Sequence, residues 1–260
     1  MNIKMIVTDL DGTLLHRNDG MDTAISDYTI SILEKCRAKG IKVVYATARD
    51  DGATVPTLSP LVDGFVHNNG AKAYADDILV YNRAIPMDDV RDLLAAADNA
   101  GVKVAAESNG VYYGNFNITG KWGWTQAYKN ADFNTLDIEV EKIFAMVDTT
   151  DESKCVELLI NKYLSNDLWL LAREEWSFVV IIHKEAIKSK GVAALAEHWG
   201  IKPSEIVAFG DDTIDIDLLE YCGIGVAVSN ALDDVKAVAD YICESNDNDG
   251  VAKWLEEYIA

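Results

Sequence analysis

Basic residues are scarce in this 260-residue chain, which has 23 lysines and arginines against 43 aspartates and glutamates. The net charge of −20 argues against binding to nucleic-acid backbones, because such binding requires basic patches. It also argues against an anionic membrane surface as a partner. The balance still allows an anionic small molecule, provided that a metal ion and a lysine lie in its binding site.

Cysteine pairs and long apolar runs are also missing. Cys36, Cys155, Cys222 and Cys243 form no C-x-x-C motif, which argues against a zinc or thiol-redox site and favours free thiols in a reducing compartment. No apolar stretch reaches the ~18 residues that a membrane-spanning helix requires. The apolar run at the N-terminus is short and ends in acidic residues, unlike a signal peptide. These features predict a cytoplasmic protein.

The content of apolar residues is sufficient for a packed protein. Hydrophobic residues make up 49% of the chain, so disorder is not expected. The length suits one large or two modest domains. No internal repeat, low-complexity tract or Gly/Ser-rich linker divides the sequence.

Two aspartates directly follow the first apolar run. The run over residues 3–7 is short and rich in β-branched side chains, which predicts a buried strand. Asp9 and Asp11 follow it in the sequence DLDGT. In open α/β sheets, ligands bind at the ends of strands. Neighbouring carboxylates raise each other's pKa, and a divalent cation with oxygen ligands would offset their charge. A D-x-D motif also occurs in solvated turns, so the rest of the chain must supply the other parts of a site.

A strand–helix–strand unit follows these aspartates. Apolar residues recur at helical spacing from residue 25 to residue 36, Gly40 is placed to end that helix, and residues 41–46 read as a second buried strand. The crossover should be right-handed, so the two strands end at the same edge of a sheet. Thr47 is therefore expected near Asp9, although it could instead cap a helix.

The sequence changes in character near residue 83, where a separate α+β unit is expected. The expected strands are residues 102–106, 110–114, 155–160 and 178–183, and the expected helices are residues 87–100 and 163–174. Between them lies a polar, aromatic stretch that includes Trp122, Trp124 and Tyr128. These aromatic residues could line a substrate pocket or could pack in the core of the unit.

The first pattern returns after residue 184. A helix is expected over residues 189–199 with Lys190 in its first turn, and a strand over residues 206–209 runs into GDDTID. Another strand is expected at residues 225–228, with Asn230 as the N-cap of the next helix. The middle unit therefore looks like an insertion in a doubly wound α/β domain.

DLDGT after the first strand, Thr47 after the second, Lys190 before Gly191 and GDDTID after a late strand occur in that order. This arrangement resembles the haloacid dehalogenase-like superfamily of phosphatases. The mid-chain insertion and the sequence GVAVSNA (residues 225–231) are similar to its Cof-type subfamily with a C2 cap. The resemblance covers essentially the whole chain. It implies an α/β Rossmann-like core with a parallel sheet at residues 1–82 and 184–260, and an inserted α+β cap at residues 83–183.

The resemblance also implies an activity and a site. It implies a Mg²⁺-dependent phosphatase that hydrolyses a small phosphorylated metabolite, such as a sugar phosphate, through an aspartyl-phosphate. Asp9 matches the nucleophile and Asp11 the general acid, while Thr47 and Lys190 match the residues that hold phosphoryl oxygens. The implied Mg²⁺ ligands are Asp9, Asp11, Asp211 and Asp215, the last of which orients Asp211. The implied partner is a small phosphate ester rather than a nucleic acid or a membrane.

Two residues of the GDDTID motif, Asp215 and Ile214, bear on the resemblance. Asp215 fits the family spacing from Asp211 better than Asp212 does. Ile214 stands where the subfamily usually has asparagine, which removes a possible polar contact near the phosphate.

Two other functions stay open: a phosphomutase of the same superfamily, and a phosphometabolite-binding protein without turnover.

Overall fold

The structure is a computed structural model that describes residues 2–18, 21–50, 57–119, 127–147, 150–163, 167–171 and 177–260. The chain divides into two compact units. The first contains Met1–Ala48, Thr54–Asn82 and Ile187–Ala260, and the second contains Arg49–Ala53 and Arg83–Ala186. Among the described residues, this division differs from the predicted core and cap at residues 49–50 and 184–186, which group with the second unit.

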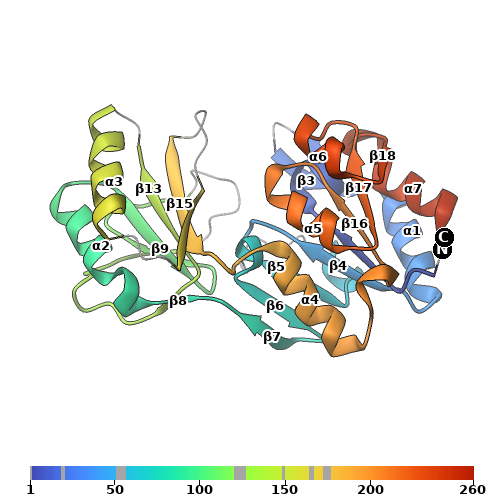
Figure 1. The fold of residues 1–260 in the computed structure, drawn as a ribbon, viewed down its shortest axis with the longest axis horizontal. Helices are drawn as coiled ribbons and strands as arrows, with labels where there is room; N and C mark the ends of the chain where they lie inside the picture. The colour runs from blue at the N-terminus through green and yellow to red at the C-terminus, as the bar shows by residue number, and fades with distance from the viewer. Residues whose placement is uncertain are drawn as a thin grey trace. The chain divides into compact units, whose positions relative to one another are not determined.

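The first unit, the core, is built on an eight-stranded sheet with the order β18-β17-β16-β1-β4-β5-β6-β7 (Figure 1). The strands are β1 (Met5–Thr8), β4 (Lys42–Ala46), β5 (Gly64–His67), β6 (Lys72–Ala75), β7 (Ile78–Asn82), β16 (Ile206–Gly210), β17 (Ile224–Val228) and β18 (Tyr241–Cys243). The six strands from β18 to β5 are parallel, and β6 and β7 are antiparallel additions at one edge. Every residue of β1 and β16 is buried, as expected for parallel strands covered on both faces. The predicted α/β fold with a parallel sheet is confirmed.

Helices cover both faces of this sheet. They are α1 (Asp27–Ala38), α4 (Lys188–Trp199), α5 (Ile216–Tyr221), α6 (Asp233–Val238) and α7 (Gly250–Tyr258). Helix α1 packs against α7, and α4 packs against α5 (Figure 1). The crossover from β1 through α1 to β4 and the crossover from β16 through α5 to β17 run in opposite directions across the sheet. Because such crossovers are almost always right-handed, α1 and α5 are expected on opposite faces. Ser26 caps α1 by accepting a hydrogen bond from the Thr29 N–H at 3.0 Å, and Gly40 follows the helix with a φ of +81°.

The second unit, the cap, contains a six-stranded sheet with the order β11-β10-β9-β13-β15-β14. Its strands are β9 (Val104–Ser108), β10 (Val111–Gly114), β11 (Ala127–Asn130), β13 (Lys142–Met146), β14 (Leu168–Leu171) and β15 (Phe178–His183). Helices α2 (Met87–Asn99) and α3 (Thr150–Tyr163) pack on this sheet around a separate apolar cluster. A short pair, β8 (Ile85–Pro86) with β12 (Glu139–Val140), completes the unit, while the hairpin β2 (His16–Asn18) and β3 (Met21–Ala24) belongs to the core.

Two elements predicted in the cap were wrong. The expected strand at residues 155–160 lies inside helix α3, and the expected helix at residues 163–174 contains strand β14. Val156 and Ile160 are buried and Tyr163 packs beside them, at spacings of four and three residues that place all three on one face of a helix. Short apolar runs do not by themselves separate strand from helix, which explains the error.

The structure also bears on the predicted thiols, on the absence of a membrane-spanning helix and on the aromatic residues. All four cysteines are free thiols; Cys36 and Cys222 are buried. Within the described residues, no helix is both long enough and apolar enough to cross a bilayer. Trp122 and Trp124 lie outside the described residues. The Tyr128 hydroxyl donates a hydrogen bond to the Gly114 carbonyl at 3.1 Å, so it is tied to the neighbouring strand.

Candidate active site

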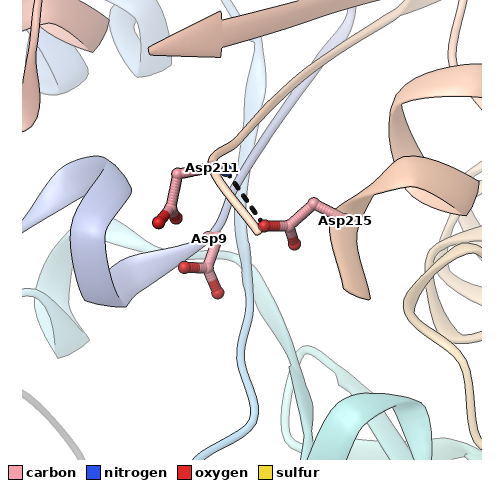
Figure 2. A group of neighbouring side chains, drawn as sticks. All are labelled: Asp9, Asp211 and Asp215. Atoms are coloured by element: carbon pink, nitrogen blue, oxygen red, sulfur yellow. Dashed lines mark hydrogen bonds between the residues drawn. The ribbon is translucent and has the colours of Figure 1, made fainter. Parts of the chain in front are cut away.

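Three aspartates from two strand ends gather at one edge of the core sheet. Asp9 follows β1, Asp211 follows β16, and Asp215 ends a short 3₁₀ turn, η5 (Thr213–Asp215). The two strands are parallel neighbours, and the Asp9 N–H donates to the Phe209 carbonyl at 3.0 Å, which keeps their ends level. One carboxylate oxygen of each aspartate lies within 4.8 Å of the others (Figure 2). The structure thus brings together three of the four predicted metal ligands.

The turn that carries Asp11 is shaped by a glycine. The chain closes a wide turn in which the Leu15 N–H donates to the Leu10 carbonyl at 3.0 Å. Gly12 has a φ of +80°, and a Cβ on it would collide with the Asp211 carboxylate. Glycine is required for both reasons. Asp11 itself is half-buried on this turn, directly beside the cluster in sequence.

Asp215 supports the loop that carries Asp211. Its fully buried carboxylate accepts hydrogen bonds from the backbone N–H groups of Asp211 and Asp212, each at 3.1 Å; Figure 2 marks the first with a dashed line. The Asp212 carboxylate instead accepts bonds from the backbone N–H and the hydroxyl of Thr213. This geometry favours Asp215 over Asp212 as the carboxylate that orients Asp211.

A buried lysine completes the cluster. Lys188 is 1% exposed, and its ammonium lies 2.6 Å from a carboxylate oxygen of Asp9 and 2.6 Å from one of Asp215. Burial works to lower the pKa of Lys188, but the two carboxylates outweigh it, so the net pKa is raised and the side chain stays charged.

This lysine is not the one predicted from the sequence. Lys190 has an exposed side chain, and Lys188, two residues earlier, is the first residue of α4. Residues two apart on a helix point in directions that differ by about 200°. Only one of the two can therefore face Asp9, and both precede Gly191 closely enough to fit the sequence pattern. The structure thus places Lys188 beside Asp9, in the position that the sequence prediction gave to Lys190.

The charges in the cluster do not balance. Burial is the largest effect on Asp9 and raises its pKa well above the usual range; Lys188 lowers it, while Asp215, Asp211 and Asp11 raise it further. One ammonium is thus insufficient to stabilise the ionised carboxylates. A divalent cation would supply the missing positive charge, and a donor set made only of oxygen atoms fits Mg²⁺.

Thr47 lies at the same edge of the sheet. It directly follows β4, which pairs with β1 so that Thr8 lies opposite Tyr45. Thr47 is 1% exposed, and its backbone is held on both sides: its N–H donates to the Val66 carbonyl at 2.9 Å, and its carbonyl accepts from the Asn69 N–H at 3.1 Å. The strand register therefore places Thr47 as the sequence predicted, at the carboxyl end next to that of β1.

Asn230 has a role that the sequence did not indicate. Helix α6 begins at Asp233 with Leu232 as its N-cap, so the prediction of Asn230 as N-cap was wrong. The Asn230 amide instead donates to the Gly12 carbonyl at 2.7 Å and accepts from the Asn246 N–H at 3.1 Å. Asn230 therefore connects the turn that follows Asp9 to the C-terminal part of the core through these hydrogen bonds. Ile214, in η5, is half-buried.

Comparisons with known proteins agree with this geometry. The chain matches a family model described as haloacid dehalogenase-like hydrolase over residues 6–255. It is 25% identical to a putative phosphatase of Haemophilus influenzae, covering 99% of this chain and 98% of that protein. It is also 25% identical to a 5-amino-6-(5-phospho-D-ribitylamino)uracil phosphatase of Bacillus subtilis, covering 98% and 97%. The solved structure of a subclass IIB sugar phosphatase superposes with a TM-score of 0.78 at 28% identity, covering 98% of both chains.

Proposed function

Since this chain belongs to the haloacid dehalogenase-like hydrolases and is a phosphatase of that superfamily, we propose that it hydrolyses a small phosphomonoester with Mg²⁺ through an aspartyl-phosphate. The observation that carries the proposal is the buried ammonium of Lys188 between Asp9 and Asp215, next to Asp211. This arrangement provides a nucleophile, a positive charge for the phosphoryl group and an oxygen-lined cation site at one point.

In this proposal each of these groups has a defined part in the reaction. A carboxylate oxygen of Asp9 attacks phosphorus in line with the leaving oxygen, and Asp11 gives its proton to that oxygen as the P–O bond breaks. Asp11 then takes a proton from water, which attacks the phosphorus of the aspartyl-phosphate, releases inorganic phosphate and restores Asp9. Asp9, Asp211 and Asp215, together with the Asp11 carbonyl, would hold a Mg²⁺ ion, which when bound would neutralise charge on the transferring phosphoryl group.

Two further side chains hold the phosphoryl oxygens in this proposal. Lys188 takes the role that the sequence assigned to Lys190, because its ammonium already lies beside the nucleophile. Thr47 contributes its hydroxyl from the end of β4. Donors fixed before the reaction are effective because they need no reorganisation as charge moves in the transition state.

The substrate class is also a proposal. One relative is named for a ribityl phosphate and a structural neighbour is named a sugar phosphatase. We infer that this chain acts on a small polyol or sugar phosphate.

The first test uses an aryl phosphate as a generic substrate. We expect phosphate release from p-nitrophenyl phosphate in the presence of Mg²⁺ and its loss in excess EDTA, because without a cation the aspartate cluster carries excess negative charge. Equal rates with and without chelator would refute the metal-dependent reaction.

A screen of sugar and polyol phosphates by phosphate release then defines the substrate, and an isomerised sugar phosphate without free phosphate would instead indicate a mutase.

A second prediction concerns pH. Burial raises the pKa of Asp9, and the nucleophile must be ionised, so kcat/KM should fall as the pH falls through that pKa. A bound cation stabilises the carboxylate and lowers its pKa. The acid limb of the profile should therefore shift to lower pH as Mg²⁺ is raised. Profiles recorded at two Mg²⁺ concentrations, one near and one well above half-saturation, measure the shift; a shift to higher pH would contradict the assignment.

A further inference from the structure

Thr13, in the loop after β1, forms a side-chain hydrogen bond with Asp211, in the loop after β16. Thr13 is 1% exposed, and its hydroxyl donates a hydrogen bond to one carboxylate oxygen of Asp211, Oδ1, at 2.6 Å. The two residues are 198 positions apart in the sequence. This bond therefore joins the loop after β1 directly to the loop after β16, at the side chain of a residue in the aspartate cluster.

The surroundings of Asp211 hold its backbone as well. Its N–H donates to Asp215, and its carbonyl accepts a hydrogen bond from the Leu232 N–H at 3.0 Å. Gly12 approaches the carboxylate so closely that no side chain would fit there. With the backbone held in this way, the contacts of the Asp211 carboxylate determine how it is rotated about its side-chain bonds. The buried hydroxyl of Thr13 is one of these contacts.

The hydroxyl bond has a consequence for metal choice. It engages one carboxylate oxygen of Asp211, which favours coordination of a cation through a single oxygen. Mg²⁺ demands compact octahedral geometry, whereas Ca²⁺ takes more ligands and often binds both oxygens of a carboxylate. We propose that Thr13 is a positioning residue that orients Asp211 and thereby favours Mg²⁺ over Ca²⁺. The inference rests on the metal-dependent function proposed above.

Calorimetric titration of the protein with Mg²⁺ and with Ca²⁺, in the absence of any substrate, tests this inference. Thr13→Val keeps the shape and removes the hydroxyl; we expect a loss of about 10–100-fold in Mg²⁺ affinity, the range for groups that orient metal ligands. The loss for Ca²⁺ should be smaller, so the ratio of the two affinities falls. Thr13→Ser keeps the hydroxyl, so its affinities for both ions should stay within about twofold of those of the wild type. If Thr13 acted only by packing, loss of its methyl group in this variant would also lower the affinities.

Thr29→Val is the matched control. Thr29 is also buried, and its hydroxyl donates to the Asp249 carboxylate at 2.9 Å, away from the aspartate cluster. This variant should lower the melting temperature without changing either affinity. If Thr13→Val fails to fold, Thr13→Ala compared with Thr13→Ser makes the same contrast.

The outcomes separate the inference from the function on which it rests. Unchanged Mg²⁺ affinity and an unchanged Mg²⁺ to Ca²⁺ ratio in the folded Thr13→Val variant would overturn the role of Thr13, while Mg²⁺-dependent phosphate release by the wild type would still support the proposed function. If the wild type binds neither ion and releases phosphate equally well in EDTA, both the inference and the metal dependence fail.

Discussion

Replacement of Asp9 by asparagine is expected to abolish phosphate release while leaving the fold intact. The amide has nearly the shape of the carboxylate but is a far poorer nucleophile, and its oxygen can still accept the hydrogen bond from Lys188. Loss of an enzyme's nucleophile costs on the order of 10⁶-fold in kcat. Steady-state phosphate release and circular dichroism of the variant measure the two parts of this expectation.

The phosphoryl group itself provides the direct evidence. Rapidly quenched wild-type protein, incubated with a labelled phosphate ester, should carry the label on the peptide that contains Asp9, and the Asp9→Asn variant should carry none. Asp212→Asn is the matched control, because Asp212 lies next to Asp211 but its carboxylate contacts Thr213. We expect the control to retain most of the activity. Label on another residue, or robust turnover by Asp9→Asn, would refute the role of Asp9.

The second large effect is expected for Lys188→Met. Removal of one oxyanion-stabilising donor costs about 10²–10³-fold in kcat, and here the donor also neutralises the nucleophile. The variant leaves Asp9 and Asp215 buried without their shared cation partner, and breaking a buried pair typically costs about 3–5 kcal/mol. We therefore also expect a lower melting temperature, partly restored by Mg²⁺, because a divalent cation offsets the same charges.

Lys190→Met distinguishes the two lysines. The side chain of Lys190 is exposed, so its loss should leave kcat, KM and the melting temperature near those of the wild type. The two variants make the same chemical change two residues apart on one helix. Severe loss of activity in Lys190→Met together with normal activity in Lys188→Met would restore the assignment made from sequence.

The architecture of the core could be predicted from sequence because its signals are local. Strands β1 and β16 are buried at every position, so each appears as a continuous apolar run that ends in aspartates. The handedness of crossovers then places such strand ends at one edge. In the cap, by contrast, α3 has only a short apolar stripe, and tertiary packing decided that Val156 and Ile160 face the sheet from a helix.

The sequence by itself determined which chemical groups follow the strands: Asp9 and Asp11 after β1, Thr47 after β4, and Asp211 after β16. Only the tertiary structure decided which other side chains meet them. Lys188 lies 179 positions from Asp9, and a helix turns each successive side chain by about 100°, so the residue at which α4 begins selects Lys188 over Lys190. Thr13 and Asn230 were likewise identified by contacts between loops that are distant in the sequence. Such contacts depend on loop geometry and side-chain rotation, which a one-dimensional pattern does not contain.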